Sequence, residues 1–346
     1  TAQSTLGQNH AEPEFFLENF NDQLGKGVDG NGSDFSGVNW TMDVSDCTLS
    51  SSNDYFKVIG GNYRLKARDV DGDAIWYSES VDISCRTDVS FFIYARIDAD
   101  MESSDFIKIE YRLDDTGGWI LAQTNGYLPG TGSRVYYNSE QFGLNGTSLQ
   151  LKVTINVNAN EETPWVDNMK VYGTAIPAPT AYAVSANNEA LCSGDVAIIT
   201  VADSETGVNY QLKKNGANEG TAIAGTGSAI EFTGITTAGT YTVEATGSCA
   251  TLTMSGSVTI TTIAAPIAYD LSSNGLDLCL FDNITINVIT SEDGVVYKLL
   301  LGGSPVSGQE ITGTGNLISF NAVNTAGTYT VQATRGICTP VDMNGS

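Results

Sequence analysis

The chain has 346 residues, of which 16 are Lys or Arg, 40 are Asp or Glu and one is His, so its formal net charge is -24. This acidity argues against nucleic acids and anionic membrane surfaces as partners, because both are bound by basic side chains. The single histidine, His10, disfavours Ser-His-Asp triads, Cys-His pairs and multi-histidine zinc sites. A carboxylate pair of the glycosidase kind is the catalytic chemistry that remains.

Residues 1–12 are polar and predict a flexible N-terminal tail that contains His10. From residue 13 to residue 174, short segments rich in β-branched and aromatic residues alternate with turn-forming clusters, without helical periodicity. FIKIEYRL at 106–113 and LQLKVTINV at 149–157 carry apolar residues at every second position. About ten strands of this kind in about 160 residues predict a jelly-roll β-sandwich over residues 13–174.

An acidic loop in this region, DVDGD, suggests a metal site. Its three carboxylates surround a glycine turn, and hard oxygen ligands of this kind are those that Ca²⁺ takes. Two aspartates beside strands would complete the ligand set, although the loop lacks the flanking helices and the final glutamate of an EF-hand. We predict a structural Ca²⁺; the alternative is that the loop is a solvated turn. The predicted ligands are Asp69, Asp71, Asp73, Asp105 and Asp167.

The four tryptophans all precede residue 174. Trp40, Trp76 and Trp165 lie within apolar strand patterns and are expected to fill the core. Trp119 follows a TGG turn and is expected to be exposed, and an exposed aromatic platform can stack on sugar rings. The predicted glycan-binding residues are Trp119, Tyr127, Tyr136 and Tyr137; the alternative is that these rings bind nothing.

The rest of the chain contains an internal repeat. APTAY at 178–182 recurs as APIAY 87 residues later, and TAGTYTV at 237–243 recurs 88 residues later. Each copy contains about seven short β-type runs, which predicts Ig-like sandwiches over 175–263 and 264–346. The phrase AGTYTV resembles the tyrosine corner of Ig-like domains, with Tyr241 and Tyr329 as the corner residues. The second copy ends before the equivalent of 258–263, so we expect this sandwich to be incomplete and the polypeptide to continue.

The six cysteines lack C-x-x-C spacing, which disfavours a zinc ribbon or a thioredoxin-like site. Six cysteines allow about 15 connectivities, but the repeat makes the last two pairs equivalent to each other and leaves the first two as partners. We predict one disulfide in each domain and hence an oxidising compartment. The predicted pairs are Cys47 with Cys85, Cys192 with Cys249, and Cys279 with Cys338.

The repeats share a Leu-Cys pair before a strand, a tyrosine-rich middle, G-T-Y-x-V and a closing cysteine. This pattern resembles the Ig-like repeats of large Bacteroidetes surface proteins that the type IX system exports. The first domain is similar to jelly-roll modules of the cleaved-adhesin and MAM-like kind, in its segments FFLENFND, NWTMDVS, RDVDGDAIWYSESVDIS, MESSDFIKIEYRLD and PWVDNMKVYG. These resemblances imply secretion to the bacterial cell surface, a structural calcium and a stalk or adhesive role.

We therefore predict a non-enzymatic secreted protein, the N-terminal part of a long adhesin that serves attachment or gliding motility. Its expected partners are an extracellular glycan or surface protein, and the secretion or anchoring machinery of the outer membrane through a region beyond residue 346. No apolar run is long enough to insert into a membrane. Three alternatives stay open: binding and spacer domains of a secreted hydrolase whose catalytic domain follows, a subunit of a surface filament, and a jelly roll that is itself a lyase or glycosidase.

Overall fold

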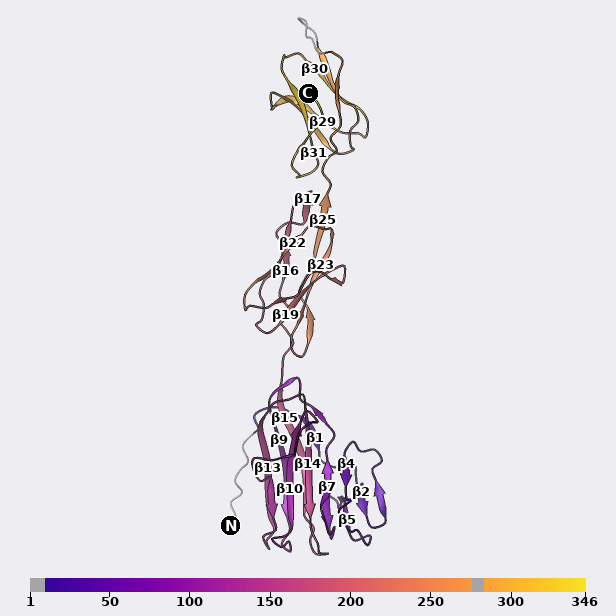
Figure 1. Cartoon of the computed structure of the whole chain (residues 1–346), viewed down its shortest axis with the longest axis vertical. Coiled ribbons are helices and arrows are strands. Elements are labelled where there is room, and N and C mark those ends of the chain that lie inside the picture. The colour runs from indigo at the N-terminus through magenta and orange to yellow at the C-terminus, as the bar shows by residue number, and fades with distance from the viewer. Residues whose placement is uncertain (1–9, 276–282) are drawn as a thin grey trace. The chain divides into compact units, whose positions relative to one another are not determined.

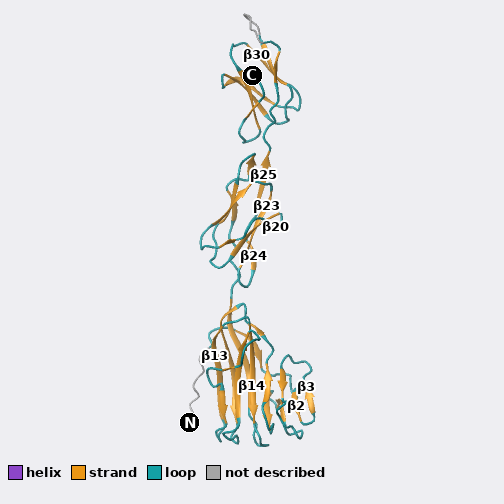
Figure 2. Ribbon diagram, viewed as in Figure 1, coloured by secondary structure: helices purple, strands orange, loops and turns teal. Residues whose placement is uncertain are grey.

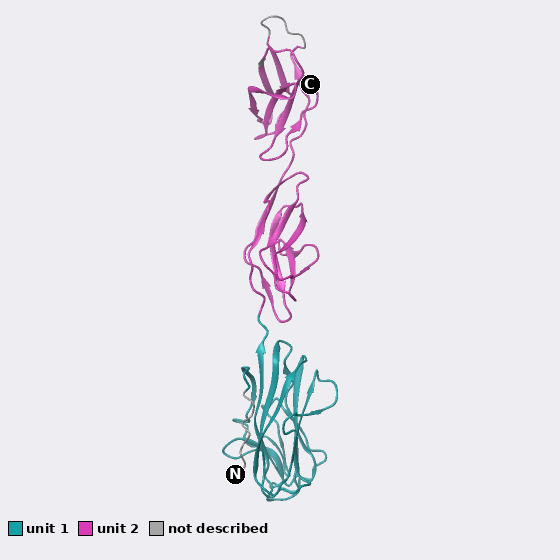
Figure 3. Cartoon of the chain, turned by 90° about the vertical axis from the view of Figure 1, so that its left-hand side faces the viewer, with its two compact units in different colours: residues 1–177 teal, residues 178–346 magenta. Residues whose placement is uncertain are grey.

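A computed structural model describes residues 10–275 and 283–346, apart from the side chain of Ala322. The described chain consists of β-strands, turns and loops, so the all-β prediction is confirmed (Figure 2). It divides into two compact units, residues 1–177 and residues 178–346 (Figure 3). Among the described residues, no helix has the length and apolar character needed to cross a membrane.

The first unit is a β-sandwich of two antiparallel sheets, which we call sheet A and sheet B (Figure 1). Sheet A has the order β13-β9-β15-β6-β5-β2-β3, with β1 paired to β15, and sheet B has the order β11-β10-β14-β7-β4, with β12 on β10 and β8 on β14. The strands of sheet A are β1 (Glu14–Glu18), β2 (Gly27–Asp29), β3 (Gly32–Asp34), β5 (Tyr55–Ile59), β6 (Arg64–Arg68), β9 (Arg86–Ile97), β13 (Val135–Leu144) and β15 (Trp165–Ala175). Those of sheet B are β4 (Thr41–Asp43), β7 (Ala74–Tyr77), β8 (Val81–Asp82), β10 (Phe106–Leu113), β11 (Ile120–Leu121), β12 (Tyr127–Pro129) and β14 (Ser148–Asn156).

The core lies between the two sheets and follows from the alternation in the sequence. Successive side chains of a strand point to opposite faces, and the apolar set of each strand faces inward. Ile107 and Ile109 on β10 are fully buried, as is Trp76 on β7. Each such side chain stabilises the fold by about 1.5–3 kcal/mol. Trp40 and Trp76 belong to this core as predicted.

Trp165 is fully buried as predicted, although it lies outside the cluster that fills the space between the two sheets. The register pairs Trp165 with Arg96, and pairs the next residue, Val166, with the core residue Ala95. Alternation therefore turns the Trp165 ring to the outer face of sheet A. There the Arg64 guanidinium lies 3.8 Å from the ring centroid and that of Arg96 lies 5.4 Å away.

His10 also differs from the prediction, because its side chain packs on the domain instead of lying in a flexible tail. Its ring stacks on Tyr172 at 4.1 Å between centroids and on Phe142 at 4.9 Å, and its Nδ1 lies 2.9 Å from the Ser90 hydroxyl. Burial lowers the pKa of His10. Aromatic stacking on the outer face of sheet A accounts for the order at this residue, which a polar local sequence does not reveal.

The second unit contains two sandwiches, one for each sequence repeat. In the first repeat the sheets have the orders β16-β18-β22 and β17-β25-β23-β19-β20, with β21 on β19 and β24 on β23; in the second they are β26-β27-β30 and β29-β28-β31-β32. The strands of the first are β16 (Val184–Ala186), β17 (Ala190–Cys192), β18 (Ala197–Val201), β19 (Asn209–Lys214), β20 (Ala217–Asn218), β21 (Ile223–Ala224), β22 (Ile230–Ile235), β23 (Gly239–Thr246), β24 (Thr251–Thr253) and β25 (Val258–Ile263). Those of the second are β26 (Leu271–Ser273), β27 (Ile284–Val288), β28 (Val296–Leu301), β29 (Ser304–Thr312), β30 (Ile318–Val323), β31 (Tyr329–Thr334) and β32 (Val341–Asp342).

The tyrosine corner predicted from AGTYTV is present in both repeats. The hydroxyl of Tyr241 donates to the carbonyl of Thr237 at 2.9 Å, and that of Tyr329 donates to Thr325 at 2.7 Å. Each bond ties a strand to the turn that precedes it, as in Ig-like domains.

A second tyrosine explains why the triplet GTG recurs. The hydroxyl of Tyr210 accepts a hydrogen bond from the Glu205 backbone N–H at 2.9 Å. Gly225, the first residue of the triplet, packs so closely on these groups that a Cβ there would lie 2.9 Å from the Tyr210 ring and would overlap the Glu205 carbonyl. The second repeat has the same arrangement in Glu292, Tyr297 and Gly313.

One disulfide of the second unit joins the two repeats. Cys192, at the end of β17, is bonded to Cys338, with their Cα atoms 5.4 Å apart. The predicted pairs Cys192 with Cys249 and Cys279 with Cys338 are therefore wrong. The repeat symmetry is satisfied equally well when the early cysteine of one copy bonds the late cysteine of the next, which the prediction did not consider. Cys249 is disulfide-bonded, and Cys279 lies outside the described residues.

In the first unit, Cys47 is a free thiol, so its predicted bond to Cys85 is also wrong. The Cys47 side chain packs against the core, and burial raises its pKa to about 12. Cys85 is nevertheless disulfide-bonded. The presence of disulfides is compatible with a secreted protein.

Candidate functional site

The structure separates the four aromatic residues predicted to bind glycan. Trp119 and Tyr127 flank β10 of sheet B. Tyr136 lies on β13 at the edge of sheet A, where it contacts Trp165, and Tyr137 packs against the core. The four rings therefore do not form one platform, and Trp119 and Tyr127 have different neighbours from those predicted.

Those neighbours are the outward-facing side chains of sheet B. Because inward and outward residues alternate on β10, β14 and β7, the residues between the core positions form one continuous outer face. We call this surface the sheet B face. Its members are Tyr77, Phe106, Lys108, Glu110, Arg112, Trp119, Tyr127, Gln150 and Lys152.

At one end of the sheet B face, Trp119 is held by an aromatic ring and two cations. Its ring centroid lies 5.5 Å from that of Tyr77. The Arg112 guanidinium lies 4.9 Å and the Lys152 ammonium 5.4 Å from the Trp119 ring, both within the range of cation–π attraction. Trp119 is half-buried in this position.

At the other end, Phe106 and Tyr127 form a second aromatic pair, with their ring centroids 5.4 Å apart. Tyr127 is 50% exposed, which leaves half of its surface available to a ligand. Phe106 and Arg112 are six residues apart on β10, so the two aromatic pairs lie about 20 Å apart along the strand at about 3.4 Å per residue.

Between the two aromatic pairs lies a compact network of charged side chains. Glu110 is only 5% exposed and contacts the ammonium groups of Lys108 and Lys152, each at 2.9 Å. Burial opposes ionisation of this carboxyl, but the hydrogen bonds from the two lysines outweigh burial and lower the pKa of Glu110. Arg112 Nε donates to the side-chain carbonyl of Gln150 at 2.9 Å. The network holds the donors of this face in fixed positions.

The five predicted calcium ligands do not converge. Asp69 accepts a hydrogen bond from the Asn160 amide at 2.8 Å, and Asp73 accepts one from Asn156 at 2.7 Å. Asp167 lies on β15, 3.7 Å from the Arg64 guanidinium. Each of these carboxylates thus has its own partner, and the acidic motif 69–73 forms a turn in which Asp69 and Asp71 have positive φ.

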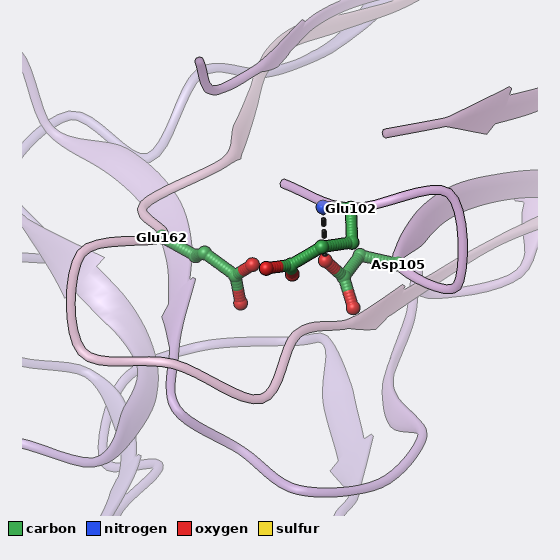
Figure 4. Close-up of side chains that lie close together, drawn as sticks. All are labelled: Glu102, Asp105 and Glu162. Carbon is green, nitrogen blue, oxygen red and sulfur yellow. Dashed lines mark hydrogen bonds between the residues drawn. The ribbon is translucent and has the colours of Figure 1, made fainter. Parts of the chain in front are cut away.

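Asp105 alone of these five belongs to an acidic cluster (Figure 4). The cluster, the single one of its kind in the described part of the chain, consists of Glu102, Asp105 and Glu162, whose carboxylate oxygens lie within 4.8 Å of one another. Glu102 and Asp105 are in the loop between β9 and β10, and Glu162 is in the loop between β14 and β15. The sequence prediction missed Glu102 and Glu162, because no local motif links two loops that are far apart in the chain.

No family model and no curated protein matches the chain. Among solved structures, the K3 cleaved adhesin domain of Lys-gingipain from Porphyromonas gingivalis is 13% identical with a TM-score of 0.27, and the match covers 46% of this chain and 100% of that chain. The CBM22-1 xylan-binding domain of Paenibacillus barcinonensis Xyn10C is 15% identical with a TM-score of 0.27, over 49% of this chain and 99% of that chain. The FN1–FN3 domains of chicken CNTN1 are 11% identical with a TM-score of 0.25, over 79% and 94%. At this similarity the matches carry no argument about function.

Proposed function

We propose that the protein is a non-enzymatic extracellular adhesive protein whose N-terminal domain binds carbohydrate on the sheet B face and whose repeats form a load-bearing stalk. The observation that carries the binding role is the arrangement of two aromatic pairs, Trp119 with Tyr77 and Phe106 with Tyr127, at the two ends of a polar network.

The chemistry of the face suits sugars. Aromatic rings offer flat apolar surfaces to the C–H faces of pyranose rings, and Arg112 and Lys152 supply N–H donors for hydroxyl or carboxylate oxygens. Since Glu110 and Gln150 hold these donors in place, little side-chain entropy is lost when a ligand binds.

The described carboxylates support a binding role over glycoside cleavage. A glycosidase needs a carboxyl of raised pKa that substrate can reach, together with a second carboxylate. On the sheet B face, Glu110 has a lowered pKa and is bound by two lysines. The described carboxyls whose pKa is raised are not members of the sheet B face; they are Glu18, Asp69, Asp105, Glu162 and Asp167.

The stalk role is supported by the disulfide between Cys192 and Cys338, which joins successive repeats covalently. Export by the type IX system and a role in attachment or gliding rest on the sequence resemblances described above. The alternative, that these are accessory domains of a secreted hydrolase, would use the same sugar-binding face. The binding experiment below therefore tests carbohydrate binding for the adhesin and for the accessory domains alike.

The test is binding of the full chain to an array of neutral and acidic polysaccharides, followed by calorimetry with the best ligand. We expect Trp119→Ala and Tyr77→Ala each to weaken binding about tenfold or more, which corresponds to about 1.4 kcal/mol. Tyr136→Ala is the matched control, because this tyrosine is 53% exposed but lies on sheet A. Loss of binding in Tyr136→Ala with Trp119→Ala unchanged would move the site to sheet A. An array without binding would reject the carbohydrate role.

A further inference from the structure

The acidic cluster of Glu102, Asp105 and Glu162 is fixed by backbone hydrogen bonds. The backbone N–H of Glu102 donates to Asp105 Oδ2 at 2.6 Å (Figure 4). Glu162 Oε2 accepts from the backbone N–H groups of Asn158 and Ala159, each at 2.9 Å. The two loops therefore hold their carboxylates toward each other in a defined geometry, and Figure 4 shows the carboxylate of Glu162 directed at that of Glu102.

In the described part of the chain, one oxygen of the cluster has no hydrogen-bond partner outside the cluster. Glu162 is 0% exposed, and its Oε1 is buried without a hydrogen bond. A buried acceptor left in this state costs about 1–3 kcal/mol, and more when it is charged. Native structures seldom tolerate such a group unless a water or an ion contacts it.

No ion pair compensates the cluster. Among the described residues, Lys and Arg pair with other carboxylates but with none of Glu102, Asp105 and Glu162. By contrast, the buried Asp98 contacts Arg96 at 2.9 Å. The cluster thus consists of three neighbouring carboxyl groups, two of them buried, without a basic partner among the described residues.

We propose that Glu102, Asp105 and Glu162 bind a calcium ion that joins the β9–β10 loop to the β14–β15 loop. Ca²⁺ takes carboxylate oxygens at about 2.3–2.6 Å, so oxygens on opposite sides of one ion are about 5 Å apart. The carboxylate oxygens of the cluster lie within 4.8 Å of one another, close enough for one ion to contact all three residues. Water completes the coordination from the side of Glu102, the exposed member.

The test uses the full chain, stripped with EDTA and exchanged into metal-free buffer. Calorimetric titration with CaCl₂ should show one site in this cluster, and the melting temperature should rise by about 5–10 °C at a calcium concentration 100 times Kd. Glu162→Gln and Asp105→Asn should each abolish this site and the thermal shift. Asp71→Asn, an exposed carboxylate of the 69–73 turn, should keep both.

Three results would overturn the proposal. Wild-type protein that neither binds calcium nor shifts in melting temperature would show that a shared proton, not an ion, neutralises the cluster. Binding retained in Glu162→Gln but lost in Asp71→Asn would place the ion in the 69–73 turn. A shift of the same size with MgCl₂ would point to a general divalent effect. The carbohydrate assay is a separate measurement, so failure of either proposal is distinguishable from failure of the other.

A second, independent observation is the position of the disulfide within the repeats. The bond between Cys192 and Cys338 spans 146 positions and encloses residues 193–337. These include most strands of both sandwiches, from β18 to β31. We propose that the disulfide is a force bypass: tension along the chain passes from Cys192 directly to Cys338, and the enclosed strands carry no sustained load.

Force spectroscopy tests this bypass, which deepens the proposed stalk role but does not depend on carbohydrate binding. Click-chemistry handles at the exposed Ala178 and at Ser346 of the full chain would apply tension across the two repeats. When both repeats unfold, the oxidised chain should extend by about 500 Å less than the reduced chain, because the enclosed residues would contribute about 3.3–3.6 Å each. Reductant, or the variant Cys192→Ser, should release that length. Release of about 500 Å from the oxidised chain would refute the bypass.

Discussion

Glu110 and Glu162 of the N-terminal sandwich are both almost completely buried, and their surroundings are opposite. Glu110, 5% exposed, lies between Lys108 and Lys152. Glu162, 0% exposed, shares its site with two further carboxylates. The first buried charge is neutralised by side chains of its own sheet, whereas the second needs a cation or a proton from solution.

The difference follows from the secondary structure around each residue. Antiparallel register places Lys152 directly opposite Glu110, and Lys108 lies two positions away on the same face of β10. Cross-strand pairing thus supplies compensation in a fixed geometry. Glu162 is in a loop, where backbone N–H groups orient the carboxylate but bring no positive charge. The buried ion pair at Glu110 contributes to structure, whereas the lack of a basic partner at Glu162 within the described chain is the basis of the calcium proposal.

The largest effect on stability is expected from removing the ion pairs that Glu110 forms with Lys108 and Lys152 on sheet B. Glu110→Gln should lower the free energy of unfolding by roughly 2–4 kcal/mol, because two lysines lose their partner in a largely desolvated site. Urea denaturation at pH 7 measures this loss. The pKa of Glu110 is lowered on folding, so its contribution is present at neutral pH and is lost as the pH falls through the folded-state pKa. Variant and wild type should therefore converge in acid, and a constant difference would contradict the ion-pair explanation.

Removing one of the two cations should have a smaller effect. Lys152→Met keeps an apolar stem of similar length but leaves Glu110 with Lys108 alone and removes a cation from the Trp119 ring. We expect a loss of about 1–2 kcal/mol in urea denaturation. In the double variant with Glu110→Gln, the losses should be non-additive by at least about 0.5 kcal/mol. Simple additivity would show that the two residues do not interact.

The surroundings of Glu110 on sheet B could be predicted from sequence. The alternation in FIKIEYRL and LQLKVTINV identifies both the core positions and the outward-facing charged residues. The repeats and their tyrosine corners were predictable for a similar reason, because each depends on a short motif. Alternation alone does not say which face of β15 the buried ring of Trp165 takes.

The features that could not be predicted join distant segments. Asp105 was predicted as a ligand, but Glu162 is brought to it only by the way two loops meet at one end of the sandwich. The predicted disulfide pairs were wrong for a related reason. Two equivalent copies permit pairing within a copy or between copies, and sequence symmetry does not distinguish these two arrangements. His10 was assigned to a tail because its aromatic partners lie far away in the sequence.

Adding a basic side chain to the cluster of Glu102, Asp105 and Glu162 should compensate its carboxylates, as Lys108 and Lys152 compensate Glu110. Glu102→Lys places an ammonium group beside Glu162 at the exposed member of the cluster. In EDTA, this variant should be more stable than wild type by about 1 kcal/mol, a value limited by partial exposure. It should also lose the thermal response to calcium. A less stable variant in EDTA would show that the cluster is not short of positive charge.

The smallest effect is expected when the substitution made at Glu110 is made at Glu162. In EDTA, Glu162→Gln should change the free energy of unfolding by no more than about 0.5 kcal/mol. A neutral amide of the same shape keeps an acceptor for the N–H groups of Asn158 and Ala159 and removes repulsion from Asp105. Urea denaturation of both glutamine variants in the same buffer makes the comparison direct. A loss as large as that of Glu110→Gln would mean that Glu162 is a compensated anion without added metal, and the contrast between sheet and loop would then be invalid.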